Sequence, residues 1–100
     1  MGVIEMKYLI VYEIKEPVIE NFKKSFEIMK ERQEKGETLS DIMVFPIHGF
    51  LSEFKTMMIV ETDDPKRISR WVADYLPVYK YKVMPILPRE EWQYLMEKYL

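Results

Sequence analysis

Few side chains in this sequence have the chemistry of a catalytic or ligand-binding group. His48 is the only histidine among the 100 residues, and a histidine acts as a general base when a substrate and an orienting partner lie beside it. Tyr8, Tyr12 and Lys82 lie in segments that we expect to be strands near that of His48. We therefore expect these four residues to line a largely apolar cavity that takes a small, partly aromatic or acidic ligand.

Two simpler interpretations of the same residues remain open. The rings of Tyr8 and Tyr12 would also suit a dimer interface, in which their hydroxyls find hydrogen-bond partners. His48 would then be an ordinary strand histidine, bonded to a neighbouring group or to water. Which face of the sheet carries the tyrosines does not follow from the sequence.

Metal and nucleotide cofactors are not expected. The chain has one histidine and no cysteine, so a typical zinc or copper site cannot form within one subunit. Asp63 and Asp64 are the candidate ligands for Mg²⁺ or Ca²⁺, but their position before Pro65 is explained by a helix cap. Three glycines in all exclude a glycine-rich phosphate-binding loop.

The charge balance argues against nucleic-acid binding. Fifteen basic and 17 acidic residues give a net charge of −2, whereas proteins that bind phosphate backbones carry a basic surplus or stripe. The RNA-recognition motif, which has a similar order of elements, stacks bases on aromatic residues of its third strand. Here residues 57–60 are Met, Met, Ile and Val.

The chain is expected to be a cytoplasmic protein that does not enter a membrane. Its apolar runs are much shorter than the roughly 18 residues of a membrane helix, and residues 1–7 do not have the pattern of a signal peptide. Asn21, Gln33 and Gln93 are the only amide side chains. Their scarcity beside abundant Glu and Lys is typical of thermophile proteins, so we expect a melting midpoint above the mesophile range.

Four segments are predicted to be strands. Residues 6–14 and 56–62 are apolar at both even and odd positions in their centres, so both faces should be covered. Residues 42–51 and 79–87 each contain a proline, which cannot donate to a β-ladder. Pro46 and Pro85 therefore place these two segments at the edges of a sheet.

Three segments are predicted to be helices. A first helix begins near Pro17 and ends near Gly36, a second begins at residues 63–65 and ends before Pro77, and a short third one follows Pro88. Each carries one apolar stripe at spacings of three and four. The stripes are Val18, Phe22, Phe26 and Met29; Ile68, Trp71, Val72 and Tyr75; and Trp92, Leu95, Met96 and Tyr99.

The resulting order, βαββαβ with a terminal helix, predicts a single α+β domain over residues 1–100 with a ferredoxin-like, four-stranded antiparallel sheet. Right-handed crossovers place the first and third strands in the centre. Both long helices must then cover one face and leave the other open, although it is apolar. Two open faces packed together would form a dimeric α/β barrel, so we expect a homodimer through this face.

The chain also resembles a small family with a domain of unknown function, grouped with the dimeric α/β-barrel proteins. The resemblance rests on residues 61–65 (Glu-Thr-Asp-Asp-Pro), the following Trp-containing helix, residues 81–87 (Tyr-Lys-Val-Met-Pro-Ile-Leu) and His48-Gly49. It implies the fold and the dimer but no activity. The chain departs from the family at residues 51–55, where the family tends to have a glycine-rich hairpin.

Three functional hypotheses follow. The leading one is a dimeric module without catalytic activity, which binds a small ligand or has a structural or regulatory role. The second is a cofactor-independent isomerase or oxygenase-like enzyme for a small organic acid, with His48 as base and with Tyr12 and Lys82 stabilising negative charge. The third is a subunit that docks on another protein through the terminal helix around Trp92.

Overall fold

A four-stranded antiparallel sheet in the order β2-β3-β1-β4 forms the centre of the molecule. The computed structural model describes residues 5–100. Its strands are β1 (Met6–Ile14), β2 (Met43–Gly49), β3 (Lys55–Thr62) and β4 (Tyr79–Ile86), and its helices are α1 (Val18–Glu34), α2 (Lys66–Tyr75) and α3 (Arg89–Tyr99). This arrangement is consistent with the ferredoxin-like fold expected from the sequence.

The two strands that contain proline lie at the edges of the sheet, as predicted. β1 and β3 are central, and β2 and β4 each pair on one side only. Around Pro46, the pairing of β2 with β3 shifts register twice, because a proline leaves a gap in the ladder. β2 is shorter than the predicted strand over residues 42–51, since Ser40–Ile42 form a 3₁₀ turn (η1) instead.

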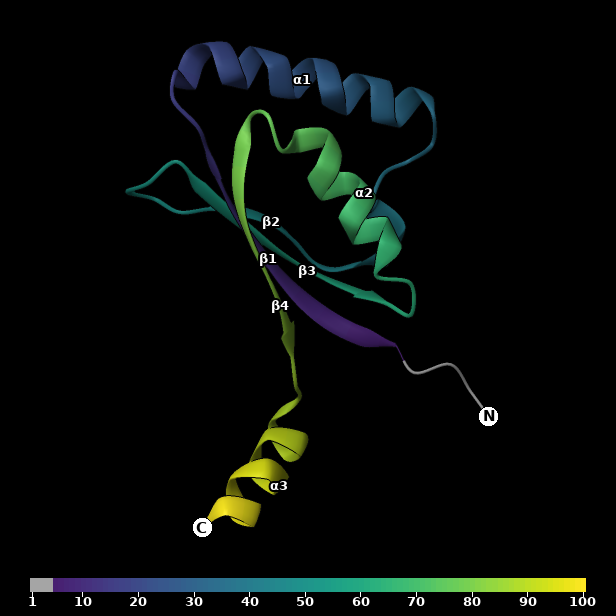
Figure 1. Cartoon of the computed structure of the whole chain (residues 1–100), viewed down its shortest axis with the longest axis vertical. Coiled ribbons are helices and arrows are strands. Elements are labelled where there is room, and N and C mark those ends of the chain that lie inside the picture. The colour runs from purple at the N-terminus through teal and green to yellow at the C-terminus, as the bar shows by residue number, and fades with distance from the viewer. Residues whose placement is uncertain (1–4) are drawn as a thin grey trace.

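The core lies between the sheet and the two helices α1 and α2, which cover the same face (Figure 1). Even-numbered residues of β1 and β3 point into it, and Ile10, Met58 and Val60 are fully buried there. β4 contributes its odd-numbered residues to this face, because Tyr81 pairs with Tyr12 and Val83 with Ile10. Helix α2 contributes Ile68 and Trp71.

Helix α1 packs differently from the prediction. The expected apolar stripe is only partly covered, with Phe22 40%, Phe26 57% and Met29 40% exposed. The buried residues of the helix are Asn21, Ser25 and Arg32. Their side chains bond locally or to the rest of the fold: Asn21 Nδ2 donates to the Lys15 carbonyl (2.8 Å), Ser25 Oγ to the Phe22 carbonyl (2.7 Å), and Arg32 to Asp74.

The start of helix α2 matches the predicted cap. The Asp64 carboxylate accepts a hydrogen bond from the Lys66 N–H (3.2 Å), and the Asp64 N–H donates to the Thr62 hydroxyl (3.0 Å). These bonds satisfy backbone groups that a helix start would otherwise leave without partners. Asp64 is therefore engaged in a structural role.

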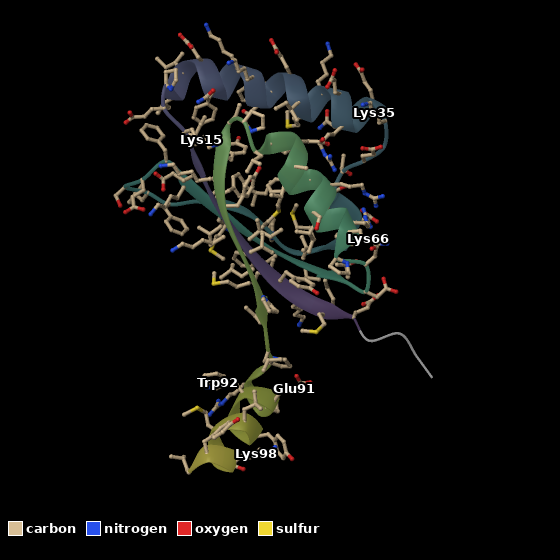
Figure 2. All side chains as sticks on the ribbon, viewed as in Figure 1. Lys15, Lys35, Lys66, Glu91, Trp92 and Lys98 are labelled. Carbon is tan, nitrogen blue, oxygen red and sulfur yellow. The ribbon has the colours of Figure 1, made fainter. Side chains whose placement is uncertain are left out.

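Helix α3 extends away from the sheet instead of packing on it (Figure 1). All of its residues are exposed, including the apolar stripe with Trp92 at 56% and Tyr99 at 84% exposed. Figure 2 shows Glu91, Trp92 and Lys98 on this separate helix, remote from the side chains that crowd between the sheet and α1. The helix itself was predicted, but among residues 5–100 it is not buried against any other element.

Candidate functional site

A cavity of about 300 Å³ lies between helix α1 and the sheet. Its upper wall is the apolar line of α1, formed by Phe22, Phe26 and Met29, and its opposite walls include Met43 and Ile47 of β2. The cavity exists because α1 buries its polar line against the rest of the fold and turns its apolar line toward this space. The side chains of this apolar line border the cavity but do not fill it.

The floor of the cavity is a cluster of aromatic rings. Tyr12 of β1 lies 5.3 Å from Trp71 and 5.0 Å from Tyr79, measured between ring centroids, and both pairs meet edge to face. Tyr75 lies 5.0 Å from Trp71 and 5.6 Å from Tyr79. Rings at these distances attract each other through their quadrupoles and form a rigid floor.

Burial keeps the hydroxyls of this floor protonated. It raises the pKa of Tyr75 to about 12 and also raises the pKa of Tyr12 above its ordinary value. At neutral pH these tyrosines are therefore neutral groups that can donate a hydrogen bond to a ligand, and neither is suited to act as a base.

A buried arginine side chain lies at the edge of the cavity. Arg32 is 6% exposed and forms an ion pair with Asp74 of α2 through one terminal nitrogen. Its Nε is buried and has no hydrogen-bond partner among residues 5–100. A buried donor without a partner is destabilising by about 1–3 kcal/mol, so this nitrogen lowers the stability of the folded chain.

The structure does not bring the four predicted site residues together. Tyr8 and Tyr12 point to the face that the helices cover. Tyr8 pairs with Val60 and Tyr12 with Tyr81, and paired residues point to the same face of a sheet. Among the four, Tyr12 alone lines the cavity under α1. A role of the four in ligand binding stays a prediction, but within one chain they do not form a single site.

His48 and Lys82 lie on the open face, at its opposite edges. They belong to one row across the sheet, with Met57 and Val11 between them, so roughly 14 Å separates their backbones. His48 is exposed, its Nδ1 is 2.7 Å from the Pro46 carbonyl oxygen, and its ring stacks on Phe45 at 4.6 Å. Its environment is that of a surface side chain bonded within its own strand.

The open face has an apolar centre and charged ends. Its central rows hold half-buried or partly exposed apolar side chains: Leu9, Val11, Phe45, Met57, Ile59 and Met84. At one end, Lys55 bridges Glu13 (3.7 Å) and Glu53 (3.2 Å). None of the described helices covers this face (Figure 1).

Two further properties concern only residues 5–100. Within this range no three or more Asp, Glu or His side chains are grouped so that they could hold a metal ion. In the same range no helix has the length and apolar character required to cross a membrane.

Sequence reasoning missed Arg32 and the apolar line of α1 as parts of a site. Trp71 was expected to fill the core, and it does so while also forming part of the cavity floor. One signal was present in the sequence: Asn21, Ser25 and Arg32 follow a helical spacing of four and seven, so they share one side of the helix. A polar line beside an apolar line indicates a helix that faces two environments.

Comparison with known proteins identifies a family but no function. Neither the curated proteins nor the solved structures include a significant match to the chain. A family described as a domain of unknown function (DUF3303) matches residues 6–100, which is nearly the whole chain. The protein therefore belongs to the DUF3303 family.

Proposed function

We propose that this protein is a small-ligand-binding module that works as a homodimer and binds its ligand in the cavity under helix α1. The observation that carries the proposal is the cavity itself, about 300 Å³ in volume and walled mainly by aromatic and apolar side chains. Ligand sites are usually concavities of roughly 300–1,000 Å³ with a few polar groups that fix orientation. Here the polar groups include Ser25, Arg32 and Gln33.

Catalysis is not part of this proposal. The enzyme hypothesis requires His48 to lie with Tyr12 or Lys82 in a closed pocket, and in the chain His48 is exposed on the face opposite to Tyr12. The cavity side holds neutral tyrosines and an arginine, which suit binding and orientation better than proton abstraction.

A neutral fluorescent probe, N-phenyl-1-naphthylamine, tests the binding site. The probe should show saturable enhancement of its emission, because aromatic and apolar side chains surround it in the cavity. Met29→Trp should abolish the enhancement, since the larger side chain fills the cavity from α1. Met96→Trp, the same change on the detached helix α3, should leave it intact. Equal enhancement in both variants, or none in the parent protein, would refute the site.

The homodimer is proposed to form through the open sheet face. Spacings of about 4.8 Å between strands and 3.4 Å along them give its four strands an area of roughly 450 Å². A standard interface buries about 800 Å² of each partner, so the sheet face alone supplies about half. A second contact surface is needed.

Helix α3 is the candidate for that second surface, with the second copy of the chain as its partner. An apolar helix face of 11 residues adds roughly 160 Å², and each subunit would both donate its helix and receive that of the partner. The total then approaches the standard size. The docking hypothesis then becomes specific, because the protein on which α3 docks is a second copy of this chain.

Sedimentation equilibrium tests the dimer. The parent chain should sediment as a dimer, and Ile59→Glu at the centre of the open face should make it monomeric because it buries a charge without a partner. Ile19→Glu, on an outer position of α1 that is 72% exposed, is the matched control. Trp92→Ala should weaken the dimer. A monomeric parent protein would contradict the proposal, and an unaltered Trp92→Ala dimer would remove α3 from the interface.

A further inference from the structure

The cavity under α1 is elongated along the helix. It is lined by α1 residues from Phe22 to Gln33, and this span corresponds to roughly 16 Å along the helix axis. Its volume of about 300 Å³ is roughly twice that of an apolar cavity of about 150 Å³ that holds benzene. A compound with at least two aromatic rings therefore matches both the length and the volume of this space.

The two ends of the cavity differ in polarity. Toward the start of α1, the rings of Phe22 and Phe26 stack with their centroids 6.2 Å apart. At the other end lie Gln33 and the hydroxyls of Thr38 and Ser40, whose oxygens are 2.9 Å apart and share a hydrogen bond. An amide and a pair of hydroxyls can both donate and accept hydrogen bonds, and neither carries a charge. This end therefore suits a neutral polar substituent.

The charges beside the cavity balance one another. In the described part of the chain, Arg32 is the only charged side chain that lines the cavity, and it is paired with Asp74. An adjoining hollow holds two further arginines and the Glu37 carboxylate. One of these arginines, Arg67, is held by Asp41 through two hydrogen bonds of 2.7 and 2.9 Å. An ion that entered the cavity would lose its hydration without gaining an unpaired charge of opposite sign.

From this arrangement we infer that the cavity binds an uncharged aromatic compound of at least two rings with a neutral polar substituent. The rings lie between the aromatic floor and the wall formed by Phe22 and Phe26, where ring edges and faces attract each other. The substituent lies at the Gln33 end. Asp74 selects against anions, because it cancels the charge of Arg32. The inference rests on the ligand-binding function proposed above and adds the chemical class and orientation of the ligand.

Three compounds with the same naphthalene rings test the charge class: 2-naphthamide is neutral, 2-naphthoate is an anion and 2-naphthylmethylammonium is a cation. In NMR titrations of the full chain at pH 7, the amide should shift the indole N–H of Trp71, in the cavity floor, and leave that of Trp92 on helix α3 unchanged. Both ions should bind roughly ten-fold more weakly, because neither finds a partner charge. Benzamide, with a single ring, should also bind roughly ten-fold more weakly, since it covers less of the apolar wall.

Asp74→Asn tests the role of the ion pair. It keeps a hydrogen-bond acceptor for Arg32 but removes the balancing charge, so the affinity for 2-naphthoate should rise about ten-fold relative to that for 2-naphthamide. Asp63→Asn, the same change at an exposed position before α2, is the matched control and should change neither affinity. If Asp74→Asn does not fold, Arg32→Gln replaces it and should increase the preference for the amide over the acid several-fold. An unchanged preference in the folded variant would overturn the selection by this pair.

The remaining outcomes separate the inference from the function on which it rests. An ion that binds as tightly as 2-naphthamide, with Trp71 shifting in both titrations, would overturn the uncharged class and leave the binding site standing. A Trp71 resonance that moves with none of the compounds, together with no binding of the neutral naphthylamine probe, would overturn both.

Discussion

Raising the pH from 8 to 12 should destabilise the protein through its buried tyrosines. Burial raises the pKa of Tyr75 from about 10 to about 12, and it raises the pKa of Tyr12 and Tyr81 as well. A group whose pKa is higher in the folded state contributes stability that is fully present below its unfolded pKa, near 10. That stability is lost as the pH rises through the folded pKa.

The size of the effect follows from the shift at Tyr75. One pKa unit corresponds to 1.36 kcal/mol, so this residue alone contributes at most about 3 kcal/mol, lost between pH 10 and 12. Total stabilities of small domains are about 5–15 kcal/mol. The loss at a single tyrosine is therefore large enough to be measured, and Tyr12 and Tyr81 should add to it.

Urea unfolding monitored by circular dichroism at half-unit steps from pH 8 to 12 measures this loss. Lysine side chains also titrate in this range, so the informative quantity is the difference between the parent protein and Tyr75→Phe. The parent should lose about 2–3 kcal/mol more than the variant above pH 10. Tyr99→Phe, at a position that is 84% exposed, should follow the parent curve. Parallel curves for the parent and Tyr75→Phe would refute the reasoning.

Three smaller predictions are measured by urea unfolding at pH 7. Ile10→Ala should lower the free energy of unfolding by about 2–5 kcal/mol, because the side chain is fully buried in the central strand. Gly36→Ala should lower it by about 1 kcal/mol, since the residue has a φ of +69° while a Cβ would meet no atom within 4 Å. Tyr81→Phe should leave it unchanged or raise it by up to about 2 kcal/mol, because the buried hydroxyl has no hydrogen-bond partner in the described chain. A clear loss of stability in Tyr81→Phe would show that this hydroxyl is bonded.

The sheet could be predicted from the sequence because two local signals agree. Central strands of this sheet are apolar on both sides, and an edge strand tolerates proline. Pro46 and Pro85 therefore predicted that β2 and β4 lie at the edges of the sheet. The start of α2 also followed, since Asp64 and Pro65 mark it clearly. Where the local side-chain chemistry allows only one arrangement of the backbone, that arrangement can be predicted from the sequence.

The site could not be predicted in the same way, because it depends on which side of a helix turns inward. The four residues proposed from their chemistry, among them His48 and Lys82, were expected to line one cavity, yet alternation along the strands places the tyrosines on the opposite face from the other two. Alternation fixes relative faces within one strand only. The faces of different strands are set by register, which the sequence leaves open.

The rotation of helix α1 is the step that joins the fold to the proposed function. Successive residues turn by about 100° around a helix axis, so the buried line through Asn21 and Arg32 lies roughly 90° from the apolar line through Phe22 and Met29. A helix selected only for stability would bury the apolar line and expose the polar one. The observed arrangement instead fixes the helix by Asn21, by the Arg32–Asp74 pair and by the packing of Ile28 against the core, and Phe22 and Met29 form a wall of the cavity. A ligand that fills this cavity would supply the burial that the helix lacks, so binding and stability should rise together.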